Sequence, residues 1–190
     1  ILEVATTTVT PAAARDGFVT GVADAAPILG GLTGHDLGCV ADRLLEELEP
    51  AEVVALTRNG PRPDQSALTV RALHDCDLVV EVVTLGLREA IEADPGSPPI
   101  DAACLLEGVQ PDDLAPYLEA RFALGSVDFE GPEATDLLAG TPIIANMVRC
   151  GTLAAFGMAN TGTPAVCIEL SQRLGDMLVT LMEADGADLG

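Results

Sequence analysis

Short, nearly continuous apolar runs recur along the chain and constrain its fold more than any other feature. They lie in four segments: 26–31, 51–64, 77–86 and 163–171. Strands that helices cover on both faces have this pattern, because neither face of such a strand meets water. We expect a buried strand in each of these four segments, and in segment 51–64 we expect a Gly/Pro turn after the strand. Two further segments, β-branched or bounded by turn residues, are also expected to be strands: 1–9 and 16–24.

Amphipathic segments alternate with the apolar runs. Segment 35–50 has apolar residues close to helical spacing, and Pro50 is expected to end it. The other expected helices are 65–76, 87–94, 111–125, 151–162 and 172–185. This alternation predicts one α/β domain over residues 1–190, with a mostly parallel or mixed central sheet and helices on both of its faces. Ligands of such sheets bind where the strands end, so we expect the site residues at those positions.

The charge balance restricts the classes of partner. Asp and Glu number 30 against nine basic residues, all of them Arg, which gives a formal net charge of −21. The acidic residues are scattered along the chain, and salt screens their mutual repulsion. We interpret this composition as adaptation to a salty cytoplasm, with an acidic surface for a basic partner as the alternative. Nucleic acid is excluded as a partner, because phosphate binding needs a positive surface.

Cysteine usage and hydropathy predict the location. The five cysteines contain no CxxC pair and mostly have apolar neighbours, so we expect buried free thiols in a reducing cytosol. No apolar run approaches the length of a transmembrane helix, and the chain does not begin like a signal peptide. We therefore expect a cytoplasmic protein without a membrane partner.

Four motifs follow one another along the chain: GGLTGHDL (30–37), VVALTRNGPR (53–62), DLVVEVVT (77–84) and GTPAVCIELS (162–171). Together they resemble the succinylglutamate desuccinylase/aspartoacylase branch of the zinc carboxypeptidase superfamily. The resemblance implies a zinc-carboxypeptidase-like α/β fold and hydrolysis of the amide bond of a small acidic acyl-amino acid.

The resemblance also assigns residues to roles. Glu169 stands at the position of the general base, while Thr33, Asp36 and Val83 stand at the three zinc-ligand positions. Thr is a poor zinc ligand and Val cannot bind zinc, so only Asp36 could serve in its family position. We therefore expect that hydrolysis is impaired and that zinc is absent, with a zinc-bound chain as the alternative.

The residues themselves leave alternatives open at the first motif. His35 and Asp36, with Glu81 or Glu169, could form a rebuilt metal site. Alternatively, a helix begins at His35, and Asp36 lies in its first turn, where a carboxylate interacts favourably with the helix dipole.

Two other candidate sites also have a functional and a structural interpretation. Glu169 lies within an apolar run, where a raised pKa would suit a general base and where a hydrogen-bonded structural role is the alternative. Arg58, Asn59 and Arg62 could bind the carboxylate of a substrate, or they could lie in a solvated turn.

Two function classes follow from these observations. The first is a zinc-dependent amidohydrolase whose activity is impaired, or one that stays active through a relocated or altered metal site. The second is a non-catalytic binding or assembly protein on the same fold. A homo-oligomer is an open alternative for either class.

Overall fold

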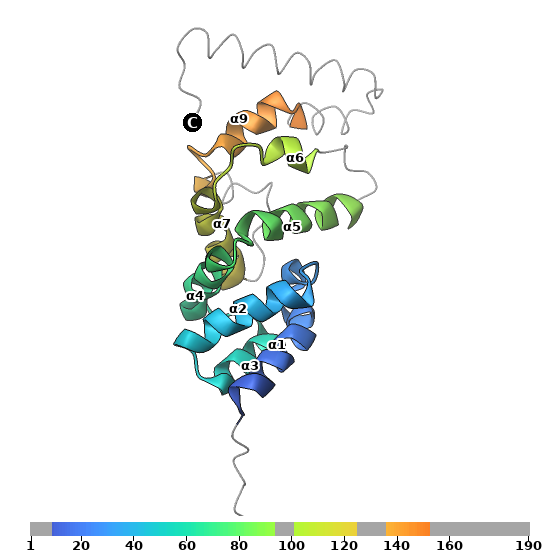
Figure 1. The fold of residues 1–190 in the computed structure, drawn as a ribbon. Helices are drawn as coiled ribbons and strands as arrows, with labels where there is room; N and C mark the ends of the chain where they lie inside the picture. Colours follow the sequence, from blue (N-terminus) through green and yellow to red (C-terminus); the bar gives the residue numbers. More distant parts are fainter. Residues whose placement is uncertain (1–8, 94–100, 125–135, 153–190) are drawn as a thin grey trace, which may run out of the picture. The chain divides into compact units, whose positions relative to one another are not determined.

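The computed structural model describes residues 9–93, 101–124 and 136–152, which form helices and turns and contain no strand (Figure 1). The α/β fold with a central sheet that the sequence predicts is therefore wrong for this part of the chain, and so is the zinc-carboxypeptidase-like fold.

Four of the six expected strands fall on described residues, and helices take their places. In chain order these are the second half of α1 (Pro11–Ala25), the 3-10 helix η1 (Pro27–Leu29), α3 (Pro50–Asn59) and the first half of α5 (Val79–Ala93). Almost all of segment 1–9 and the whole of segment 163–171 lie outside the described residues.

The apolar runs are helical because their buried residues recur at helical rather than strand spacing. In α5, Val79, Val82, Val83 and Leu87 are all buried, a pattern that one face of a helix can supply and a strand cannot. A short apolar run satisfies both periods, so periodicity alone does not separate a strand from a buried helix.

Proline marks where many of these helices begin. Pro50 begins α3 and does not end the preceding helix, α2 (Gly34–Glu47). Proline is well suited to the first turn, where its missing N–H has no partner to lose and its φ is already helical. The other helices that begin at a proline are α1, α4 (Pro63–Asp75), α7 (Pro111–Leu124) and α9 (Pro142–Arg149). Helices α4 and α7 confirm the helices that the sequence predicts at 65–76 and 111–125.

The chain divides into two units, which we describe separately. The first contains residues 1–82 and 115–127, and the second contains residues 83–114 and 128–190. In the first unit α1 packs on α2 and α3, and α2 packs on α4. In the second unit α6 (Ala102–Leu105) contacts α9.

An aliphatic core holds the first unit together. In α1, Ala14, Phe18 and Val22 lie four residues apart and form one buried stripe. The residues buried on the other helices include Val40 and Leu44 of α2, Val53 and Leu56 of α3, and Val70 and Leu73 of α4. Burial of this apolar surface is the main stabilising contribution, since each such side chain contributes about 1.5–3 kcal/mol.

Four of the five cysteines form disulfide bonds. Cys39 of α2 is bonded to Cys76 at the end of α4, and Cys104 of α6 is bonded to Cys150 at the end of α9. The expectation of free thiols is therefore wrong for these four residues, each of which is half-buried. Each bond lies within one unit.

Among the described helices, none combines the length and the apolar character needed to cross a membrane.

Candidate functional site

The turn before α2, which the sequence suggests as a metal site, is a helix cap. The Thr33 hydroxyl accepts a hydrogen bond from the Asp36 backbone N–H at 3.3 Å, and the Asp36 carboxylate accepts one from the Thr33 backbone N–H at 3.0 Å. These reciprocal bonds form a capping box, to which the Thr33 hydroxyl adds a donated bond to the same carboxylate. The Thr33 hydroxyl lowers the pKa of Asp36, mainly through this side-chain bond.

The structure confirms the alternative in which Asp36 lies in the first turn of a helix. His35 is exposed beside it, while Val83 is buried in the interior of α5 and Glu81 is exposed. Within the described ranges, no three His, Cys, Asp or Glu side chains gather as metal binding would require. Glu169, the expected general base, lies outside the described residues.

The three residues expected to bind a substrate carboxylate lie near one another in the chain, at the junction of α3 and α4. Arg58 and Asn59 are exposed at the end of α3, and Arg62 is the residue that precedes α4. Gly60, between them, has a φ of 68°, a left-handed conformation that glycine adopts without steric cost. All three side chains are exposed to solvent, as the alternative interpretation predicts, but only Arg62 lies in the turn, because Arg58 and Asn59 belong to the last turn of α3.

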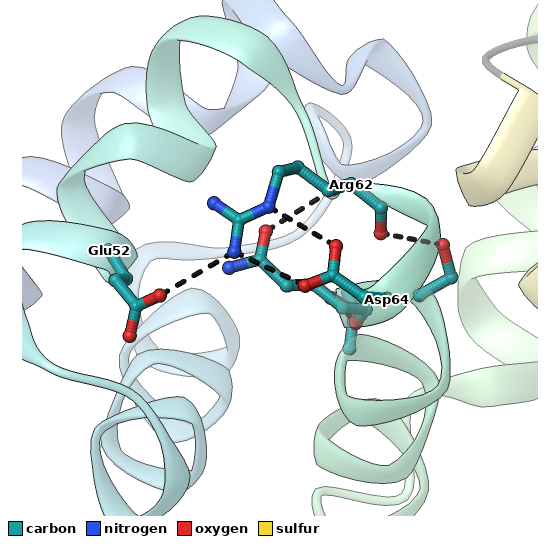
Figure 2. Close-up of polar contacts among 6 residues, drawn as sticks. Glu52, Arg62 and Asp64 are labelled. Atoms are coloured by element: carbon teal, nitrogen blue, oxygen red, sulfur yellow. Dashed lines mark hydrogen bonds and ion pairs between the residues drawn. The ribbon is translucent and has the colours of Figure 1, made fainter.

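Arg62 is already engaged by two carboxylates of its own chain (Figure 2). Its Nε lies 3.2 Å from Oδ1 of Asp64, and its Nη2 lies 3.5 Å from Oε1 of Glu52. The hydrogen bond with Asp64 raises the pKa of Arg62 and lowers that of Asp64. A substrate carboxylate would have to displace these partners, so Arg62 is better suited to joining α3 to α4 than to binding an anion.

A shallow groove between α2 and α4 combines an aliphatic floor with charges of both signs. The floor consists of Leu44 and Ala72, which are buried, and Leu68, which is half-buried. A disulfide joins the two helices that form this groove, since Cys39 in the second turn of α2 is bonded to Cys76 at the end of α4. The disulfide lies one turn along α2 from the first groove residue.

Five charged side chains line this groove: Arg43, Glu46, Glu47, Arg71 and Asp75. Arg43 and Glu46 pair with each other at 2.8 Å. Among the described residues, the side chains of Arg71, Glu47 and Asp75 take part in no ion pair or hydrogen bond. The groove thus presents one guanidinium and two carboxylates that are available to another molecule. The spacing of these three residues in the sequence matches no motif, so only the packing of α2 against α4 shows that they lie together.

The second unit holds a polar cluster with a structural role. The buried Asn146 side chain donates hydrogen bonds to the backbone carbonyls of Leu105 and Glu107, at 3.0 and 2.8 Å. Its amide oxygen accepts a bond from Arg149, which also pairs with the Glu107 carboxylate at 2.8 Å. The cluster satisfies the carbonyls after α6 and joins that helix to α9.

Comparison with known proteins adds no assignment: no protein-family model, curated protein or solved structure matches the chain. The resemblance to the aspartoacylase branch therefore depends on the motifs alone and stays a prediction.

Proposed function

We propose that the chain is a non-catalytic assembly protein that associates with a second copy of itself through the face formed by α2 and α4. The observation that supports this proposal is the groove between these helices, where Arg71, Glu47 and Asp75 surround an aliphatic floor without partners among the described residues. Exposed charges of both signs on one face are what a self-complementary interface requires.

Twofold symmetry explains why one face can bind its own copy. Away from the twofold axis of such an interface, a residue meets a different residue of the other molecule, and each of these contacts occurs twice. Arg71 of one copy then pairs with Glu47 of the other, and the reverse pair forms at the same time. The half-buried Leu68 is covered at the centre, where loss of water strengthens the flanking ion pairs.

Salt should strengthen this association, whereas it weakens most interfaces that depend on ion pairs. Two copies with a net charge of −21 each repel one another in dilute buffer. The Debye length falls from about 10 Å at 0.1 M salt to about 3 Å at 1 M, which screens this long-range repulsion. Ion pairs in contact and partly buried are screened less. We therefore expect the dimer to become stronger as salt increases.

Analytical ultracentrifugation tests the proposal at about 0.1 M and about 3 M KCl. The wild-type chain should be dimeric at high salt, and R71E and E47R should each weaken the dimer by at least about tenfold. The charge-swapped double variant, R71E with E47R, should recover most of the affinity because the pair is restored with opposite polarity.

R58E is the matched control, because it makes the same change at an exposed arginine outside the groove. It should dimerise like the wild-type chain. A wild-type chain that stays monomeric at high salt, or a double variant no better than its parents, contradicts the proposal. Circular dichroism of each variant checks that the helices are intact.

Hydrolysis of an acyl-amino acid, with Glu169 as general base, stays a prediction from the motifs. Metal analysis after dialysis separates it from the assembly role. About one zinc per chain would support the hydrolase, since a catalytic zinc is held by three protein ligands. A metal-free chain that dimerises as above would support assembly.

The cytoplasmic location also stays a prediction. This prediction depended in part on the expectation of free thiols, and four of the cysteines are instead bonded in pairs. Because disulfides are rare in most reducing cytosols, that part of the argument no longer supports it. Alkylation of thiols at the moment of cell lysis, followed by mass spectrometry of the cysteine peptides, measures the redox state in the cell.

A further inference from the structure

The turn between α4 and α5 has a backbone conformation that its residue disfavours. Asp77 has a φ of 58°, in the left-handed region that glycine usually occupies at the end of a helix. Its N–H donates to the carbonyl of His74 at 3.0 Å, and the N–H of Leu78 donates to the carbonyl of Leu73 at 2.9 Å. This bond pattern is a Schellman motif with aspartate at the glycine position.

Two structural features hold this turn in place. On one side, Cys76 is the C-cap residue of α4 and is bonded to Cys39 of α2. On the other side, Leu78, Val79 and Val82 are buried. Aspartate adopts the left-handed conformation more readily than most residues but at a higher cost than glycine, and its surroundings in the folded chain must offset that cost. The disulfide is the covalent part of those surroundings.

We propose that the Cys39–Cys76 disulfide is a redox-operated lock on the α4–α5 turn. Cys39 and Cys76 are each half-buried, so neither residue belongs to the fully buried core, and the reductant in this proposal is a small dithiol. The dithiol transfers two electrons and two protons, which breaks the S–S bond, yields two cysteine thiols and converts the dithiol into its own cyclic disulfide. The end of α4 is then free of α2, and the turn at Asp77 relaxes to a right-handed or frayed conformation.

The lock and the proposed dimer have separate readouts: amide exchange at Asp77 and Leu78 reports on the lock, and sedimentation of the charge variants reports on the dimer. The Cys104–Cys150 disulfide is the internal comparison, since it lies in the other unit. The residue after Cys150 is Gly151, with a φ of 68°, which adopts the left-handed conformation at no steric cost. Of these two disulfides, only Cys39–Cys76 therefore adjoins a turn whose left-handed residue is not glycine.

Amide hydrogen exchange tests the lock on the full chain in about 3 M KCl, where repulsion among the acidic side chains is screened. Breaking the bond, by a dithiol or in the variant C39S with C76S, should speed exchange at Asp77 and Leu78 by at least about tenfold. The variant C104S with C150S should leave these two amides unchanged. Adding D77G to the first variant should restore much of the protection, because glycine needs no lock.

A second measurement is the equilibrium between the chain and a dithiol. It uses a chain that keeps all its cysteines, so it does not require the cysteine variant to fold. If the bond and the turn stabilise each other, D77G must shift the equilibrium with a dithiol towards the Cys39–Cys76 disulfide, by about threefold or more. Equal exchange at Asp77 and Leu78 with and without the bond overturns the proposal. So does a uniform loss of protection across α1 to α4, or an equilibrium that D77G leaves unchanged.

Discussion

At the scale of single residues, Asp36 shows how one pattern serves two purposes. A His–Asp pair after a glycine turn resembles a metal-binding motif, yet the Asp36 carboxylate accepts the hydrogen bonds of a capping box with Thr33. A metal-binding turn of this kind and a capping box both place a carboxylate at the start of a helix. The first turn of a helix stabilises negative charge through its exposed N–H groups and dipole, so capping alone accounts for the residue.

The capping box leads us to predict how the free energy of unfolding depends on pH. The Thr33 hydrogen bonds hold the pKa of Asp36 below its ordinary value of 3.8, so the ionised carboxylate stabilises the folded chain. This contribution is present above the unfolded pKa and is lost as the pH falls through the lower, folded pKa. D36N should therefore cost about 0.5 kcal/mol of unfolding free energy near neutral pH and nothing at acid pH.

Urea unfolding of D36N and the wild-type chain from about pH 7 to about pH 2.5 measures this difference. T33A is the companion variant, with an expected cost of about 1 kcal/mol from loss of the N-cap hydroxyl. A cost of D36N that persists at the lowest pH would assign the effect to packing and not to ionisation.

Asp77 makes a second prediction at this scale. D77G should raise the free energy of unfolding by about 0.5 kcal/mol, because the left-handed conformation penalises aspartate by more than the extra chain entropy of glycine costs. D75G is the contrasting change, since Asp75 lies in the last turn of α4, where glycine is unfavourable. Thermal unfolding compares the two, and a stabilising D75G or a destabilising D77G would contradict the assignment of strain.

At the scale of elements, α1 has two glycines beside α3 that differ in how much space a side chain would find there. A Cβ built on Gly17 would lie 3.9 Å from Cγ2 of Val54, an ordinary contact. One built on Gly21 would lie 3.2 Å from Cβ of Thr57, which is tighter than side chains normally allow. The close approach is therefore set by the second glycine, one turn further along the helix.

The two glycines form a matched pair for mutation. G17A should raise the free energy of unfolding by about 0.5–1 kcal/mol, the difference in helix propensity between glycine and alanine. G21A gains the same propensity but forces α1 away from Thr57, so it should be less stable than G17A by at least about 0.5 kcal/mol. Urea unfolding measures both. Equal stabilisation by the two changes would show that α1 and α3 are not closely packed at Gly21.

At the scale of the whole molecule, the chain contains two units with one disulfide each. The bonded cysteines are 37 and 46 residues apart, so each bond greatly restricts the unfolded chain. A high net negative charge acts in the opposite direction, since it favours expansion in dilute buffer. Covalent bonds and salt therefore stabilise the same compact state by different means.

Removing either disulfide should destabilise its own unit. By loop entropy, the variants C39S with C76S and C104S with C150S should each lose about 4 kcal/mol of unfolding free energy. Hydrogen exchange locates the loss: within the first unit and most strongly at Asp77 and Leu78 for the first variant, and at α6 and α9 for the second. A variant that loses protection equally in both units would show that the units unfold as one.

The sequence predicts the amphipathic helices better than the apolar ones. The helices at 34–47, 63–75 and 111–124 were recognisable from spacing, and so was the first-turn position of Asp36. The helices that include segments 51–64 and 77–86 were not, because a short apolar run fits a strand and a buried helix equally well. Proline at the first helical position was the overlooked signal at Pro50.

The sequence by itself determined the aliphatic core, the acidic character of the chain and the local caps, because these depend on composition and on neighbours within one helical turn. Only the tertiary structure decided that the apolar runs are helices, which cysteines are bonded, and that Arg71 and Glu47 line one groove. Those outcomes depend on contacts between residues far apart in the chain, and such contacts leave no fixed spacing in the sequence.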